Sequence, residues 1–143
     1  MRRSENLTIR RDLAEVGPAA IQVHEWAEAV LDQDAVEDVE LALVEALTNA
    51  IRHGKAAPQD RIGIHVELAE DELVIELLDS SPPMPRCLLD EAGAESFIFD
   101  ETDINSIAES GRGLSLMVVL MDEVGYRLVD GHTRLRMVRR RRD

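Results

Sequence analysis

The fold is decided by the stretch Val36-Glu-Asp-Val-Glu-Leu-Ala-Leu-Val-Glu45-Ala-Leu-Thr-Asn49-Ala-Ile-Arg-His53-Gly54. Apolar residues recur in it every three or four positions, which predicts one helix of about five turns. Its apolar face consists of Val36, Val39, Leu43, Ala46, Leu47 and Ala50. A polar stripe consists of Asp38, Glu45, Asn49 and Arg52. Because Glu45 and Asn49 are four residues apart, their side chains project together from adjacent turns.

The pairing of Glu45 with Asn49 suits a chemical site. A carboxylate can take a proton from a nucleophile, and a carboxamide oxygen is a hard ligand suited to Mg²⁺. A polar stripe that simply faces water is also common on surface helices. The helix alone therefore leaves both interpretations open.

The composition indicates one globular domain, residues 1–143, with 45% apolar and 31% charged residues. The net charge of −13 argues against general nucleic-acid binding, because phosphate repels an acidic surface. Cys87 is the single cysteine, so no internal disulfide can form, which suits a reducing compartment. Neither a signal peptide nor a run of about 20 apolar residues is evident. We therefore expect a cytoplasmic protein that makes no contact with a membrane.

The remaining periodicities predict an α+β fold. Strands are expected at 7–13, 61–68, 73–78, 122–130 and 133–138, helices at 19–31 and 36–53, and a further apolar helix after Gly113. Asp34 is the expected cap of the second helix. Hairpins at 61–78 and 122–138, with helices between, imply a mixed, mostly antiparallel sheet covered by helices on one face.

Two further features could build a site with Glu45 and Asn49. Asp79 ends a strand ahead of three prolines, and an ionised carboxylate there could accept a hydrogen bond from the exocyclic amine of adenine. Gly111-Arg-Gly113 precedes a helix, where glycines and free backbone amides suit phosphate, and Arg112 adds a cation. Taken separately, each is as well explained by an ordinary turn.

Together, and in this order, the features resemble the ATPases shared by gyrase, Hsp90, histidine kinases and MutL (GHKL). Glu45-Ala-Leu-Thr-Asn49-Ala is similar to the N-box of that superfamily, and Asp79 to the aspartate of its first glycine box. Gly111-Arg-Gly-Leu-Ser-Leu resembles the second glycine box. The short chain, His53 and Leu120-Met-Asp-Glu-Val124 resemble the bacterial anti-sigma factor serine kinases of the RsbW and SpoIIAB type.

The resemblance implies the Bergerat ATP-binding fold and a role for each matching residue. Glu45 would be the general base on a partner serine, Asn49 would coordinate Mg²⁺, and Asp79 would bind the adenine amine. Residues 86–110 would form a lid over ATP. The further nucleotide-binding positions would be His53, Pro83, Gly111, Arg112, Gly113, Leu114 and Ser115. The implied partners are an anti-anti-sigma protein with a STAS domain, a sigma factor and a second copy of the chain.

One departure supports an alternative function. The first glycine box usually contains two glycines after its aspartate, whereas this chain has Asp79-Ser-Ser-Pro-Pro. The alternative is a regulatory module that sequesters a partner, binds nucleotide weakly or not at all and transfers no phosphate. A kinase-like domain of a larger phosphatase or sensor system is compatible with the same motifs.

The end of the chain is rich in arginine, at positions 134, 136 and 139–142. A basic tail of this kind can contact nucleic acid, lipid or a protein partner, or can be a solvated end. Because the rest of the chain is acidic, we expect a solvated end or a partner contact.

Overall fold

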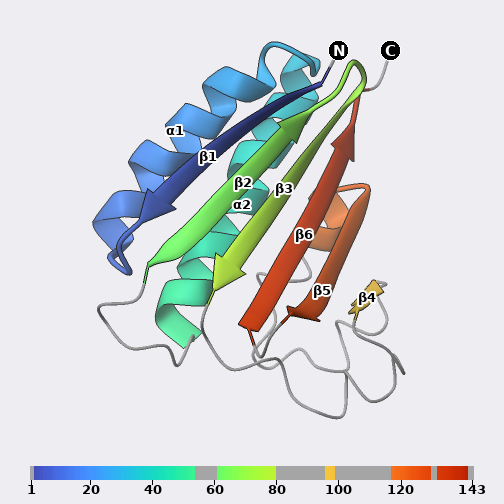
Figure 1. The fold of residues 1–143 in the computed structure, drawn as a ribbon. Helices are drawn as coiled ribbons and strands as arrows, with labels where there is room; N and C mark the ends of the chain where they lie inside the picture. Colours follow the sequence, from blue (N-terminus) through green and yellow to red (C-terminus); the bar gives the residue numbers. More distant parts are fainter. Residues whose placement is uncertain (1, 54–60, 80–95, 99–116, 130–131, 142–143) are drawn as a thin grey trace.

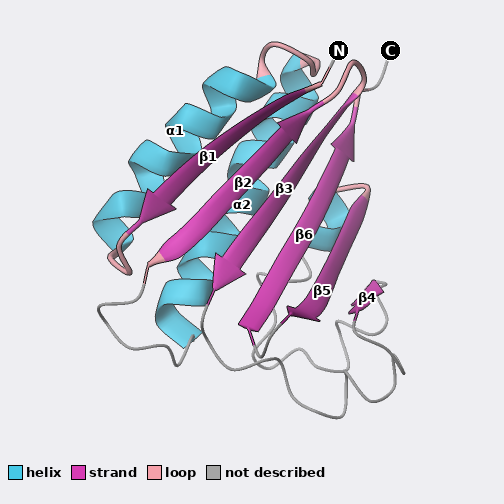
Figure 2. Ribbon diagram, in the orientation of Figure 1, coloured by secondary structure: helices cyan, strands magenta, loops and turns pink. Residues whose placement is uncertain are grey.

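The molecule has two layers, a sheet and a set of helices that cover one of its faces (Figure 1). The structure is a computed structural model that describes residues 2–53, 61–79, 96–98, 117–129 and 132–141. Figure 2 shows the strands side by side, with the helices behind them. The predicted two-layer α+β architecture is confirmed.

The sheet contains six strands within the described residues. They are β1 (Arg3–Ile9), β2 (Ile62–Leu68), β3 (Glu72–Asp79), β4 (Ser96–Ile98), β5 (Glu123–Val129) and β6 (His132–Arg140). Their order across the sheet is β1-β2-β3-β6-β5-β4, and each described pair is antiparallel. The last residue of β3, Asp79, therefore lies opposite Thr133 near the start of β6.

The helical layer is formed by η1 (Leu13–Glu15), α1 (Val16–Ala27) and α2 (Gln33–His53), and residues 117–120 are also helical. Pro18 falls in the first turn of α1, where its missing N–H costs no hydrogen bond. The predicted cap of α2 is wrong. Asp32, not Asp34, precedes the helix, and its Oδ2 accepts a hydrogen bond from the backbone N–H of Ala35 at 3.3 Å.

The core lies between the helices and the sheet. Alternate residues of β2 and β3 are buried toward the helices, as the two-residue period of a strand requires. The largest fully buried side chains are Leu43, Leu47, Ile62, Ile64, Leu73, Ile75, Met117, Met137, Val23, Val36 and Val39. The predicted apolar face of α2 thus packs on the sheet.

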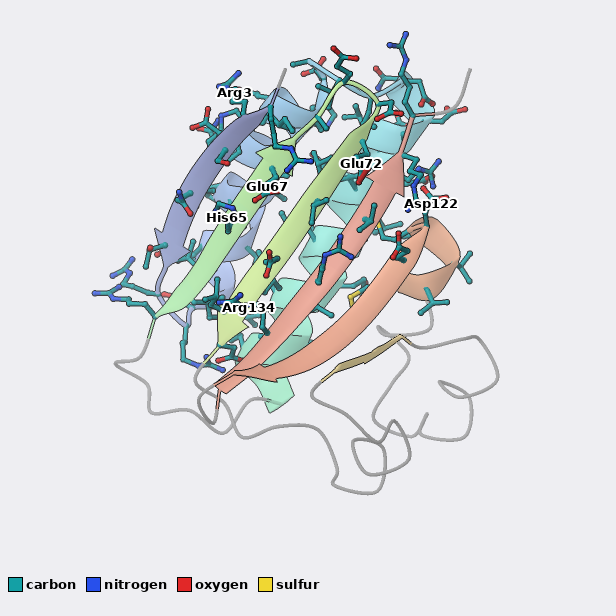
Figure 3. All side chains as sticks on the ribbon, turned by 45° about the vertical axis from the view of Figure 1, so that its right-hand side comes forward. Arg3, His65, Glu67, Glu72, Asp122 and Arg134 are labelled. Carbon is teal, nitrogen blue, oxygen red and sulfur yellow. The ribbon has the colours of Figure 1, made fainter. Side chains whose placement is uncertain are left out.

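The opposite face of the sheet is polar. The register places His65 of β2 beside Glu76 of β3, which in turn lies opposite Arg136 of β6. Figure 3 shows His65, Glu67 and Arg134 on this face, which the helices do not cover. This alternation of buried and exposed residues is typical of an antiparallel sheet with one solvated side.

The arginines near the end of the chain belong largely to this sheet. β6 continues to Arg140, and four of them lie within it: Arg134, Arg136, Arg139 and Arg140. Arg134 pairs with Glu76 at 3.4 Å, and Arg136 pairs with Glu123 at 3.7 Å. Residues 134–140 therefore belong to the sheet, with Arg136 and Arg140 exposed on it, and the predicted solvated end or partner contact stays a prediction.

Other elements also differ from the predictions. The first strand occupies Arg3–Ile9 rather than 7–13, because Asp12 caps η1 and ends the extended segment. The first helix ends at Ala27 rather than Leu31. Ser96–Ile98, within the predicted lid, forms β4 against β5.

Candidate functional site

Glu45 and Asn49 lie on α2 beside its buried face. Leu43, Ala46 and Leu47 are buried against the sheet, whereas Glu45 and Asn49 are half-buried. Within the described part of the chain, no hydrogen bond or ion pair engages either of these two side chains. A carboxylate and a carboxamide thus stand one helical turn apart.

Asp79 lies at the end of β3, on the face of the sheet that the helices cover. Because side chains alternate along a strand, Asp79 points to the same face as buried Leu77, while Leu78 is exposed on the other face. The Asp79 side chain is only 11% exposed. Figure 1 shows the end of α2 and the end of β3 at the same end of the molecule. The fold therefore brings Asn49 and Asp79 to the same end of the molecule.

Arg11 joins these two elements. Its Nη1 lies 2.5 Å from Oδ1 of Asp79, and its Nη2 donates a hydrogen bond to the backbone carbonyl of Ala50, the residue after Asn49. The Arg11 side chain is 5% exposed. One buried guanidinium thus connects the carboxylate at the end of β3 to the turn of α2 that carries Asn49.

The turn that carries Arg11 is fixed by hydrogen bonds. Asp12 N donates to Arg10 O at 2.8 Å, and Ala14 N donates to Asp12 Oδ1 at 2.9 Å. Glu15 Oε1 accepts from the backbone N–H of Arg10 at 3.0 Å. This bond, and a second from the Arg10 side chain, lower the pKa of the Glu15 carboxyl because they favour its ionised form. Arg11 is therefore presented on an ordered turn.

Sequence reasoning did not identify Arg11. The available signal was a pair of adjacent arginines after the first strand, of which Arg10 is exposed and Arg11 is buried. The partner of Arg11 is 68 residues away in the chain. Helix and strand periodicity carries no information about such a contact.

The other predicted site residues cannot be placed. His53 is the last residue of α2, and its side chain lies outside the described residues. The remaining positions outside them are Pro83, Gly111, Arg112, Gly113, Leu114 and Ser115. Among the described residues, no group of three or more His, Cys, Asp or Glu side chains gathers to hold a metal ion. Asn49 is the predicted metal ligand that the structure does describe.

A family model for the histidine kinase-like ATPase domain matches residues 9–139. The chain belongs to this family. The matched range includes α2, Asp79 and residues 111–115. The predicted resemblance to RsbW-type proteins is also confirmed by curated relatives.

Those relatives are named serine-protein kinase RsbW. The protein from Bacillus licheniformis is 32% identical over 101 residues, which cover 70% of this chain and 62% of the relative. The protein from Bacillus subtilis strain 168 is 30% identical over 103 residues, covering 64% of this chain and 56% of the relative. The matched region thus spans less than two thirds of either relative.

A solved structure supports the fold of this histidine kinase-like ATPase domain. It is the crystal structure of the RsbU and RsbW domains of Rv1364c from Mycobacterium tuberculosis. Its TM-score is 0.67 at 18% identity, and the match covers 99% of this chain and 33% of that chain. In the described part of the chain, none of the helices combines the length and apolar character needed to cross a membrane.

Proposed function

We propose that this chain is an ATP- and Mg²⁺-dependent anti-sigma factor serine kinase. It would bind a sigma factor and phosphorylate a serine of an anti-anti-sigma partner with a STAS domain. The observation that carries the proposal is the Glu45–Asn49 pair, which stands on α2 near the Arg11–Asp79 ion pair in a domain of the ATPase family. The names of the relatives supply the reaction class.

The proposed reaction assigns one step to Glu45. The Glu45 carboxylate accepts the proton of the partner's serine hydroxyl as the serine oxygen attacks the γ-phosphorus of ATP. The bond from that phosphorus to the β–γ bridging oxygen breaks, and ADP leaves. Phosphoserine and protonated Glu45 remain, and the proton then passes to solvent. Because Glu45 is half-buried beside apolar residues, it is shielded on one side from water.

Nucleotide binding is assigned to Asn49, to Asp79 and to residues outside the described part of the chain. The Asn49 amide oxygen fits Mg²⁺, which would neutralise charge on the phosphates. Asp79 would accept a hydrogen bond from the 6-amino group of adenine. The remaining contacts are assigned from the family resemblance to His53, Pro83, Gly111, Arg112, Gly113, Leu114 and Ser115, with residues 86–110 as the lid.

Charge offers a reason for release of the phosphorylated partner. Phosphorylation adds about two negative charges to the serine. The chain itself has a net charge of −13. Repulsion between the two would weaken the complex with the product and free the kinase for the sigma factor.

We further propose that the protein acts in the cytoplasm as a homodimer.

Phosphate transfer is the direct test. The protein is incubated with Mg-ATP and a cognate STAS protein, and the phosphorylated site is identified by mass spectrometry. We expect serine phosphorylation by the wild type and by Glu37→Ala, which removes an exposed carboxylate from the same helix. Glu45→Ala should transfer at least about 100-fold more slowly. Transfer at the wild-type rate by Glu45→Ala would refute the assignment of the base.

A second candidate function is a partner-sequestering module without kinase activity. The feature that favours it is Asp79-Ser-Ser-Pro-Pro, in which both glycines of the usual box are replaced. Calorimetry with Mg-ATP separates the two candidates. Nucleotide binding by the wild type that is lost in Asp79→Ala supports the kinase. If the wild type binds no nucleotide but still binds the sigma factor, the result supports the module.

A further inference from the structure

The buried Arg11 side chain bonds to two different elements of the fold. Its side chain is 5% exposed, and both of its terminal nitrogens have partners, Asp79 on β3 and the Ala50 carbonyl on α2. The planar guanidinium donates in a fixed fork, so these two bonds also fix the direction between the partners. Arg11 thus sets where the Asp79 carboxylate stands relative to the Asn49 turn.

The orientation of Asp79 matters for recognition of a purine base. An ionised carboxylate is only an acceptor, and its two oxygens offer about four lone-pair sites. It can therefore accept from a guanidinium and from a second donor, such as an amino group. A purine with a carbonyl at position 6 presents an acceptor instead, which the same carboxylate opposes.

We propose that Arg11 is a positioning residue that determines the preference of the site for a 6-amino purine, acting through Asp79. This inference rests on the proposed nucleotide binding. Without Arg11, the Asp79 side chain would lose its bond at 2.5 Å and its link to α2, so its carboxylate would be held less firmly in this orientation. The amino group of ATP would then lose a fixed acceptor, whereas a 6-oxo nucleotide would lose an unfavourable neighbour.

The test compares ATP with inosine triphosphate, which carries a carbonyl in place of the 6-amino group. Titration calorimetry with Mg²⁺ gives the dissociation constant of each nucleotide for each variant. We expect the wild type to prefer ATP, and Arg11→Ala to reduce the ratio of the two affinities about tenfold. Arg10→Ala is the matched control, because Arg10 is the exposed neighbour on the same turn and should leave the ratio unchanged.

Arg11→Lys is the conservative variant, and it tests the same position if Arg11→Ala does not fold. A lysine keeps the positive charge, but its compact ammonium group cannot reproduce the two-armed fork. We expect Arg11→Lys to reduce the ATP preference about threefold, between the wild type and Arg11→Ala. A wild-type ratio in folded Arg11→Lys would overturn the inference.

A double-mutant cycle shows whether Arg11 acts through Asp79. In the Asp79→Asn background, adding Arg11→Ala should leave the affinity ratio unchanged. If Arg11→Ala lowers the affinity ratio in the Asp79→Asn background as much as it does in the wild type, the inference is overturned. Tighter ATP binding by Arg11→Ala would also overturn it, because the guanidinium would then compete with the amine of adenine for Asp79. If the wild type binds neither nucleotide, the proposed function fails and this inference fails with it. ATP binding by the wild type with an unaltered ratio in Arg11→Ala defeats the inference alone.

Discussion

Nη1 of Arg139 lies 3.0 Å from Oδ2 of Asp38, which ties the last strand to the first half of α2. The same nitrogen donates a hydrogen bond to the backbone carbonyl of Leu120. Arg139 is buried, with only 5% of its surface exposed. Its cation also lies at the end of the helical segment 117–120, where the helix dipole favours positive charge. Arg139 therefore connects three parts of the fold.

Removing this guanidinium should destabilise the protein strongly. Arg139→Ala leaves Asp38 without its partner in a half-buried position, and we expect the free energy of unfolding to fall by about 3 kcal/mol. Arg136→Ala is the control, because its pair with Glu123 is exposed and should contribute less than about 1 kcal/mol. Urea unfolding followed by circular dichroism measures both. Equal losses in the two variants would contradict the special role of the buried arginine.

The apolar face of α2 provides a second matched pair. Leu43 is fully buried, whereas Leu41, two residues earlier on the same helix, is 44% exposed. Leu43→Ala should lower the free energy of unfolding by about 3 kcal/mol, because it removes buried methyl groups and leaves a cavity. Leu41→Ala should change it by less than about 1 kcal/mol. A similar midpoint shift for both in chemical denaturation would show that α2 packs through a different face.

Periodicity was sufficient to predict the two-layer architecture. The 3.6-residue spacing around Leu43 and Leu47 identified α2, and strict alternation from Ile62 to Leu68 identified β2, because those elements bury one face each. Boundaries were less predictable, since they depend on capping. Asp32 and Asp34 are both plausible caps by residue type, and only the backbone geometry decides between them.

The candidate site was predicted only where its chemistry is encoded locally. Glu45 and Asn49 share one helix, so their spacing in the sequence was enough to place them together. Arg11 meets Asp79 through the packing of β1, β2 and β3, and Arg139 meets Asp38 across the two layers. Such contacts depend on the whole fold. Charge alone gave no reason to choose Arg11 over Arg10.

The turn that carries Arg11 should be sensitive to pH through Glu15. The pKa of Glu15 is lowered in the folded protein from its ordinary value of 4.5, because Arg10 donates to its ionised carboxylate through the backbone and the side chain. The resulting stabilisation is present above pH 4.5 and is lost as the pH falls through the lowered folded value. Glu15→Gln should therefore be less stable than the wild type at pH 7, and the difference should shrink at pH 3. Thermal unfolding at both pH values measures it, with Glu25→Gln as the control on α1; a difference that does not depend on pH would contradict the role of the charge.

The role of Asn49 can be separated from that of the base by the effect of Mg²⁺ on nucleotide affinity. The Asn49 side chain is half-buried and has no bond within the described part of the chain, so Asn49→Ala should change the free energy of unfolding by less than about 1 kcal/mol. If the carboxamide oxygen ligates Mg²⁺, this variant should lose about tenfold or more in ATP affinity when Mg²⁺ is present and little when it is chelated.

Calorimetry with and without a chelator gives both values, and Glu37→Ala on the same helix should keep the full effect of the metal. Glu45→Gln should also keep it, because the base acts on the partner's serine rather than on the nucleotide. An undiminished Mg²⁺ effect in Asn49→Ala would assign the metal to other ligands.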